Sequence, residues 1–445
     1  MPKLNENIYY EQTKKFPFRT VTTYRNLTKG TDELMKVAPG KEVLASLNNV
    51  DITYGTGSHA FRAVTDFNIN IYKGEVLGLV GESGSGKSTI GRAIIGLTPH
   101  SFGEIKILDQ VLPHKMKRGF KFGKKLRDYK KLENFMVNKV QMIFQDPANS
   151  LNPHKNVEAV VSEGLVNTKN AKEIYIYNYD QDVVKEVYSY LNQETHPELF
   201  GWYKRELDKD IAVDENVAFS SLYHDFYAKL KKQEGVDEAL EVLKKAYEER
   251  KELNKLSETD CRKVLVRNIL KSVGLDDSVL KRYPLEFSGG QQQRIGISRA
   301  VALRPQLLIA DEPISALDVS IQAQVVNIFN DLKEKYNLTI LFIAHDLRMV
   351  EYISDRIAVM NKGRLLEVGS TDEIMNHSLH PYTKSLLDSV PSIDSDKQSL
   401  IGYEYNPSIH EYSYQNQPEW IKINDDHFIL ATPKELEEWK QGIYK

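Results

Sequence analysis

The chain has 445 residues, of which 41% are hydrophobic and 27% are charged, and its formal net charge is −3. This length allows two or three domains with at least one sizeable core, and the near-neutral charge gives no electrostatic reason to expect nucleic acid as the main partner. The single cysteine, Cys261, excludes an intramolecular disulfide framework and any cysteine-rich metal or iron–sulfur site.

The first predicted elements follow a polar stretch, residues 1–42, which we interpret as an N-terminal extension. Apolar and polar residues alternate over 50–54 and 67–71, a pattern typical of half-buried antiparallel strands. Residues 76–80 form an unbroken apolar run, as expected for a parallel strand that is buried on both faces. The sequence therefore predicts antiparallel strands followed by the first strand of a parallel sheet.

A phosphate-binding motif follows that strand. Residues 81–89 read Gly-Glu-Ser-Gly-Ser-Gly-Lys-Ser-Thr and match the P-loop pattern G-x-x-x-x-G-K-[ST]. Its glycines let successive backbone N–H groups point at phosphate oxygens, Lys87 reaches the β- and γ-phosphates, and the hydroxyl of Ser88 ligates Mg²⁺. We predict that ATP is bound by Gly81, Glu82, Ser83, Gly84, Ser85, Gly86, Lys87, Ser88 and Thr89.

The alternative interpretation of this glycine-rich stretch is a flexible linker. A linker would not lie between a buried strand and an amphipathic helix, and a helix is expected over 90–97. Its apolar face is predicted to consist of Ile90, Ala93, Ile94 and Leu97.

Residues 113–139 are strongly basic and interleaved with aromatic side chains. This composition would suit a patch that binds nucleic acid or anionic lipid. Runs of charge are more often solvated surface, so we predict a surface loop between two core strands.

Residues 167–257 form a second interruption, rich in Tyr, Glu and Lys. Apolar residues recur there at helical spacing, both around 223–230 and around 236–247. We predict at least two amphipathic helices packed as a helical insert, whose apolar faces form a core without chemistry of their own.

Three further apolar runs, at 140–144, 307–310 and 339–344, predict buried strands, and their alternation with helices favours a parallel sheet of the α/β class. Asp311 and Glu312 end the second of these strands. A buried carboxylate is costly without a cation, so Asp311 is predicted to meet the Mg²⁺ of the P-loop. Glu312 could polarise the attacking water as a general base. A simple helix cap is the alternative role for this pair.

Gln145 and His345 also follow predicted strands. The neutral amide of Gln145 could orient water or touch Mg²⁺ without adding charge, although any exposed glutamine would look the same. A lone histidine after a strand is more often structural. The position of His345, on the strand after the one that ends in Asp311 and Glu312, favours a contact with the γ-phosphate.

A second phosphate-binding element is predicted from Ser288, Gly289, Gly290 and Gln291, which precede a helical stretch over 292–303. Serine is a good helix N-cap, and the glycines leave backbone N–H groups open to an anion. Because the chain has only one P-loop, this unpaired element indicates that a partner chain supplies the other half of each site.

In this order the motifs resemble those of ABC transporter ATPases: Walker A at 81–88, the Q-loop glutamine at 145, the signature at 288–291, Walker B at 307–312, the D-loop at 315–318 with Asp318, and the switch histidine at 345. Tyr54 stands where the family places an aromatic that stacks on adenine, although one aromatic in a strand is usually packing. Residues 144–153 and 380–387 resemble the oligopeptide/dipeptide permease ATPases, most of all those of the OppF type.

The resemblance implies an α/β fold of the ABC ATPase kind, with a P-loop parallel-sheet core, an antiparallel β subdomain and a helical signature subdomain. The expected ABC ATPase domain is 43–375, its helical subdomain about 146–303 including the insert at about 167–257, and 376–445 is the C-terminal region. Gln145 and Ser288 lie further apart than in typical relatives, which the insert explains. Phe287 replaces the usual leucine before the signature, a conservative change.

The resemblance also implies partners. The chain would form a head-to-tail dimer with a second ABC ATPase, predicted to be a different chain, and would act on two transmembrane permease subunits and indirectly on an extracellular peptide-binding protein. Its expected cofactors are ATP and Mg²⁺. Some relatives carry an iron–sulfur cluster after residues 380–383, but no cysteine follows here, so no cluster is expected. No run approaches the ~18 apolar residues of a membrane span, so we expect a peripheral position on the cytoplasmic side of the cell membrane.

The predicted function is therefore ATP hydrolysis that energises oligopeptide import. Within the family, dipeptides, nickel or another solute remain possible cargoes, because an ATPase does not contact the cargo. ABC proteins that act on nucleic acid carry cysteine-rich zinc modules, long coiled coils or two cassettes in one chain, and none of these is visible in the sequence. An inert scaffold is disfavoured by Glu312.

Overall fold

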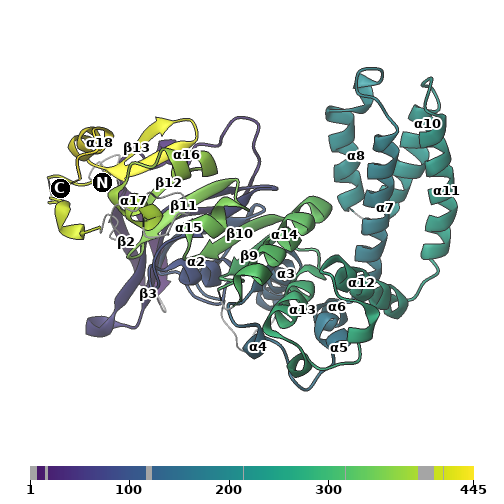
Figure 1. The fold of residues 1–445 in the computed structure, drawn as a ribbon, viewed down its shortest axis with the longest axis horizontal. Coiled ribbons are helices and arrows are strands. Elements are labelled where there is room, and N and C mark those ends of the chain that lie inside the picture. The colour runs from purple at the N-terminus through teal and green to yellow at the C-terminus, as the bar shows by residue number, and fades with distance from the viewer. Residues whose placement is uncertain are drawn as a thin grey trace. The chain divides into compact units, whose positions relative to one another are not determined.

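The computed structural model describes residues 8–15, 19–116, 123–213, 215–315, 317–388, 405–413 and 415–444. The chain divides into two compact units (Figure 1). One combines Met1–Ser150 with Pro305–Lys445, and the other is Leu151–Arg304. We describe each unit separately.

The first unit contains an eight-stranded mixed sheet with the order β13-β14-β12-β11-β5-β10-β9-β8. Five neighbouring strands are parallel, namely β11 (Arg356–Asn361), β5 (Val76–Val80), β10 (Thr339–Ala344), β9 (Leu307–Asp311) and β8 (Val140–Ile143). The four buried strands predicted from apolar runs are confirmed. Their residues are buried on both faces because helices cover a parallel sheet from both sides.

Three antiparallel strands extend this sheet beyond β11, and the sequence pattern did not reveal them: β12 (Arg364–Ser370), β14 (His427–Ala431) and β13 (Glu419–Asn424). The C-terminal region is thereby joined by backbone hydrogen bonds to the sheet that carries the P-loop strand.

A second, four-stranded antiparallel sheet has the order β4-β3-β6-β7, formed by β4 (Phe61–Tyr72), β3 (Val43–Tyr54), β6 (Phe102–Ile107) and β7 (Gln110–Val111). The two antiparallel strands predicted at 50–54 and 67–71 are confirmed and are longer than predicted. The N-terminal extension contains the β1 (Ile8–Lys15) and β2 (Arg19–Asn26) hairpin and α1 (Thr31–Leu34). Arg25 of β2 donates to the buried Asp51 carboxylate at 3.0 Å, which holds the hairpin against β3.

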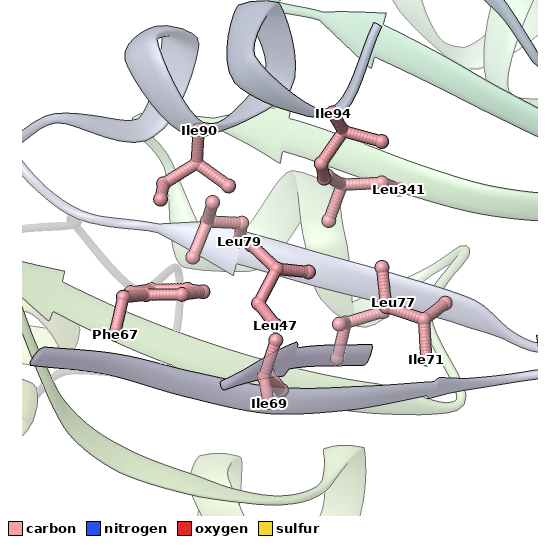
Figure 2. Close-up of a pocket in the computed structure, with 9 residues that line it drawn as sticks. All are labelled: Leu47, Phe67, Ile69, Ile71, Leu77, Leu79, Ile90, Ile94 and Leu341. Atoms are coloured by element: carbon pink, nitrogen blue, oxygen red, sulfur yellow. The ribbon is translucent and has the colours of Figure 1, made fainter. Parts of the chain in front are cut away.

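Helix α2 (Lys87–Ile94) packs on the sheets through Ile90, Ala93 and Ile94, as predicted. The prediction for Leu97 was wrong: it follows the end of the helix and is 55% exposed. Beneath α2, side chains of β3, β4, β5 and β10 surround a cavity of about 10 Å³ (Figure 2). Its lining is entirely apolar, so a water there would find no hydrogen-bond partner. The cavity is a packing gap and not a ligand site.

The basic segment, residues 113–139, was predicted to be a surface loop. Residues 117–122 lie outside the described residues, and the structure corrects the prediction for 123–139. Residues 123–139 form helix α3 (Gly123–Lys139). Leu132, Phe135 and Met136 pack against the hydrophobic core, at the spacing of one helical face. This apolar face accounts for the helix, while Lys124, Lys125, Lys130 and Lys131 are exposed.

The remaining helices of the first unit are α4 (Pro147–Ser150), α14 (Val319–Tyr336), α15 (Leu347–Glu351), α16 (Thr371–Asn376), α17 (Pro381–Asp388) and α18 (Pro433–Lys440). The described part of the chain has no helix long and apolar enough to span a bilayer.

The second unit is helical: α5 (Val157–Val161), α6 (Glu163–Thr168), α7 (Ala171–Ser189), α8 (Trp202–Val213), α9 (Glu215–Ser220), a π-helical turn (Ser221–Phe226), α10 (Tyr227–Leu230), α11 (Asp237–Leu253), α12 (Glu258–Ser272) and α13 (Gly289–Val301). In Figure 1, α7, α8, α10 and α11 run side by side, and α5, α6, α12 and α13 gather at one end of them. Helices α7 to α11 lie within the predicted insert, 167–257, so the prediction of at least two helices there is confirmed. We call these helices the insert bundle.

The insert bundle has its own hydrophobic core, drawn from residues 183–246. An ion pair is also buried in it: Arg250 Nε lies 3.1 Å from Asp180, and the two side chains are 1% and 0% exposed. The hydroxyl of Tyr223 donates to the same carboxylate at 2.8 Å. Because a buried charge without its partner is costly, these three residues fix how α7, α11 and the π-helical turn pack together.

Candidate nucleotide site

The site is built where four parallel strands end. In the sheet order β5, β10, β9 and β8 are neighbours, so the residues that follow their carboxyl ends meet at one edge of the sheet. Ligands of open α/β sheets bind at this edge. The P-loop follows β5, His345 follows β10, Asp311 and Glu312 end β9, and Gln145 follows β8.

The P-loop conformation depends on its glycines. Gly86 has φ of +104°, a left-handed conformation that side chains rarely adopt, and a Cβ there would lie 2.9 Å from the Ala63 carbonyl oxygen. A Cβ at Gly81 would lie 2.0 Å from the carbonyl oxygen of Met360. Helix α2 begins at Lys87 with no side-chain cap, so its first N–H groups are open to an anion.

Lys87 is buried within this loop. Its ammonium donates to the carbonyl oxygens of Gly81 at 2.6 Å and of Glu82 at 2.8 Å. Burial lowers the pKa of Lys87, while the carboxylates of Glu312, Asp311 and Glu82 oppose this shift. The loop therefore holds one cation among carbonyl and carboxylate oxygens, placed to receive an anionic ligand.

Ser88 and Asp311, predicted to share Mg²⁺, are brought together. The Ser88 hydroxyl donates to the Asp311 carboxylate at 2.6 Å. Burial raises the pKa of Asp311, and the hydrogen bond from Ser88 acts against this shift. A hydroxyl and a nearly buried carboxylate are hard oxygen ligands of the kind that Mg²⁺ uses beside substrate phosphates. The residues present thus fit the ion.

Gln145, Glu312 and His345 form a second group at the same edge. The Gln145 amide donates to the Glu312 carboxylate at 2.9 Å, and His345 Nδ1 lies 3.8 Å from the same oxygen. Glu312 has φ of +46°, a conformation that is uncommon for a residue other than glycine. Its amide donates to the Ile343 carbonyl in β10, which holds this backbone conformation. The Glu312 carboxylate thus lies between a neutral donor and an imidazole.

Tyr54 ends β3, and its hydroxyl lies 3.4 Å from the hydroxyl of Thr89 in α2. Tyr54 is 42% exposed, so it is accessible to a ligand. The structure therefore brings the predicted adenine contact beside the P-loop helix.

The signature residues lie in the other unit, 151–304. Ser288 is the N-cap of α13. Its side chain accepts a hydrogen bond from the Gln291 backbone N–H, and the Gln291 side chain accepts one from the Ser288 backbone N–H. The N-cap role predicted for Ser288 is confirmed. Asp318, the D-loop residue, is exposed at the N-cap position of α14 in the first unit.

One contact with the P-loop was missed by sequence reasoning. Tyr382 of α17 accepts a hydrogen bond from the Glu82 amide at 2.9 Å across 300 residues of sequence. The only signal was the family likeness of residues 380–387, which does not indicate a contact with the P-loop.

Comparison with known families decides the assignment. The ABC transporter family model matches residues 64–315, more than half of the chain. The chain belongs to the ABC transporter family. A second model, the oligopeptide/dipeptide transporter C-terminal region, matches residues 366–413. The family resemblance and the ABC ATPase fold predicted from the motifs are confirmed, and the chain is an ABC-type ATPase.

Several curated relatives are similar over nearly the whole ABC chain. The oligopeptide transport ATP-binding protein OppF of Streptococcus pyogenes serotype M1 is 37% identical over 406 residues, which cover 90% of this chain and 99% of the relative. The dipeptide transport ATP-binding protein DppF of Lactococcus lactis subsp. cremoris is 38% identical over 402 residues, 90% of this chain and 97% of the relative. Among solved structures, cbiO1 from Clostridium perfringens matches with a TM-score of 0.48 and 20% identity, covering 76% of this chain and 92% of that chain.

Proposed function

We propose that this chain is the ATP-binding and ATP-hydrolysing subunit of an ABC importer that energises oligopeptide uptake across the cell membrane. The proposal depends on one observation: the P-loop and the group formed by Gln145, Glu312 and His345 lie at the same edge of the sheet. The names of the relatives, oligopeptide and dipeptide transport ATP-binding proteins, support peptides as the cargo class.

In this proposal the P-loop amides and Lys87 bind the β- and γ-phosphates, and Tyr54 contacts adenine. Ser88, Asp311 and Gln145 would hold Mg²⁺, which when bound neutralises charge on the phosphates. The Glu312 carboxylate accepts the proton of the attacking water, and Gln145 orients that carboxylate through its amide. His345 would contact the γ-phosphate from the strand next to β9.

The same proposal includes partners. A second ABC ATPase would supply a signature motif to this P-loop and receive Ser288, Gly289, Gly290 and Gln291 in return. The pair would act on two transmembrane permease subunits from the cytoplasmic face of the membrane, and a peptide-binding protein outside the cell would deliver the cargo. The exposed position of Asp318 is compatible with a contact between the two ATPases.

The test is a Lys87→Ala variant in the assembled importer, reconstituted in vesicles with ATP inside. Loss of the buried ammonium removes the only side-chain cation of the P-loop, so ATP affinity and ATP-driven uptake of a labelled oligopeptide should both fall. We expect at least about tenfold weaker nucleotide binding, the order of one hydrogen bond to a charged group. Normal ATP binding by Lys87→Ala would exclude the P-loop as the nucleotide site, and uptake of dipeptides alone would correct the cargo.

The insert bundle should be dispensable for nucleotide binding. The Glu258 carboxylate accepts from the amides of Ala171 at 2.7 Å and Lys172 at 2.9 Å, so the two ends of the insert meet. Since the bundle has a separate core, replacing residues 173–256 with a short Gly/Ser linker should leave ATP affinity within about twofold. Any loss should be in coupling to the permease or in binding another protein. A folded deletion variant that no longer binds ATP would show that the insert supports the site itself.

A further inference from the structure

The C-terminal region reaches the P-loop through one buried side chain. Tyr382 is 1% exposed, and its hydroxyl accepts from the Glu82 amide. Burial raises the pKa of Tyr382 to about 12, so the phenol stays neutral at physiological pH. Glu82 is the second residue of the loop, and Lys87 donates to its carbonyl oxygen. Lys87 also donates to the Gly81 carbonyl oxygen at 2.6 Å, so the phenol and the P-loop lysine bind opposite ends of the same peptide unit.

Tyr382 is itself held by a buried histidine. The Tyr382 amide donates to Nδ1 of His380 at 3.1 Å. Burial lowers the pKa of His380 far below its usual value, which keeps the ring neutral and Nδ1 able to accept. The ring centroid of Tyr405 lies 5.3 Å from that of Tyr382. The ring centroid of Trp439 lies 5.1 Å from that of His380. The start of α17 is thus enclosed by the C-terminal segment.

A buried carboxylate fixes the backbone just before α17. Glu367 of β12 is 0% exposed and accepts from the amides of Leu379 at 2.7 Å and His380 at 3.3 Å. His427 of β14 lies 2.9 Å from Glu367 and 3.0 Å from Glu373. Burial opposes the charged imidazole, but the hydrogen bonds to the two carboxylates raise the pKa of His427 overall. The Glu367–His427 pair thus joins strands β12 and β14 to the backbone that leads into α17, the helix that carries Tyr382.

We propose that the C-terminal region sets the P-loop conformation, and hence the affinity for ATP, through a path from His427 to Glu367, to the 379–380 backbone, to Tyr382 and to the Glu82 amide. Tyr382 is the positioning residue of this path. This inference rests on the proposed role of the P-loop. It gives the described residues 366–388, 405–413 and 415–444 a part in nucleotide binding that is separate from any contact with the permease.

The test compares Tyr382→Phe, which removes only the hydroxyl, with Tyr188→Phe in the assembled complex. Tyr188 is a matched control because its buried hydroxyl donates to the Leu199 carbonyl at 2.6 Å in the other unit. Tyr382→Phe should raise the KM for ATP and the Kd for a fluorescent ATP analogue about three- to tenfold, the order of one hydrogen bond. Its kcat at saturating ATP should stay within twofold, because the hydroxyl does not touch the reacting group. Tyr188→Phe should change neither KM nor Kd.

Hydrogen exchange gives a second measurement. Deuterium uptake of a peptide containing Glu82 should rise in Tyr382→Phe but not in the control, and His427→Gln should produce the same change to a smaller degree. Unchanged KM and unchanged exchange at Glu82 in Tyr382→Phe, with ATP binding lost in Lys87→Ala, would overturn this inference alone. Normal binding by Lys87→Ala would instead overturn the proposed site. Equal changes in both tyrosine variants would assign the effect to general stability and reject the path.

Discussion

Replacing Glu312 with glutamine is expected to lower the rate of ATP hydrolysis by ~10²-fold or more, since a general base contributes at least about that factor. ATP affinity should stay close to that of the unchanged protein. A glutamine at position 312 has the same shape. Its side-chain oxygen can still accept the hydrogen bond that Gln145 now donates to Glu312 Oε2 at 2.9 Å. What it cannot do is take a proton from water. The loss should therefore appear in kcat and not in KM for ATP.

The measurement is steady-state hydrolysis together with nucleotide binding in the assembled complex. Glu334→Gln, on the exposed face of α14, changes the same functional group away from the site and serves as the control. Near-normal turnover by Glu312→Gln would remove Glu312 from the role of base. A loss of ATP affinity equal to the loss of turnover would indicate instead that Glu312 mainly orders the loop near Lys87.

Local patterns predicted much of the fold because each depended on residues close in sequence. The apolar runs predicted at 76–80, 307–310 and 339–344 are buried parallel strands, and Ser288 is a helix N-cap. Helix α3 was missed because its basic residues outnumber the three apolar ones that reach the core.

Contacts between distant residues were beyond a sequence argument. The grouping of Gln145 with Glu312 requires β8 and β9 to be neighbours, which follows from the sheet order and not from either strand alone. The Tyr382 contact with Glu82 depends on strands β12 to β14, whose short mixed pattern gave no clear period. The motifs therefore indicated the candidate site residues, while the arrangement that supports them had to come from the structure.

Ser288→Ala is expected to cause the second large loss of ATP hydrolysis. Which of the two nucleotide sites loses activity is what tests the proposed dimer. The chain carries one P-loop and one signature, so in the proposed dimer Ser288 serves the companion's nucleotide and not the one bound at Lys87. Ser288→Ala combined with Lys87→Ala would then damage both sites and leave almost no hydrolysis. Ser288→Ala combined with loss of the companion's P-loop lysine would damage one site twice and leave the activity of the other.

Non-additivity of this kind is what a double-mutant cycle detects for residues that share a site. The matched control is Ser257→Ala, because Ser257 caps α12 in the same unit by accepting from the Asp260 amide. Each substitution should cost about 0.5–2 kcal/mol of stability through the lost cap, but only Ser288→Ala should reduce hydrolysis. The effects of Ser288→Ala and Lys87→Ala on hydrolysis could instead prove non-additive, while those of Ser288→Ala and loss of the companion's P-loop lysine add. The signature would then act on the P-loop of its own chain, and the shared-site arrangement would be wrong. Because the Ser288 hydroxyl already accepts from the Gln291 amide within α13, this cycle separates its capping role from its role toward a nucleotide.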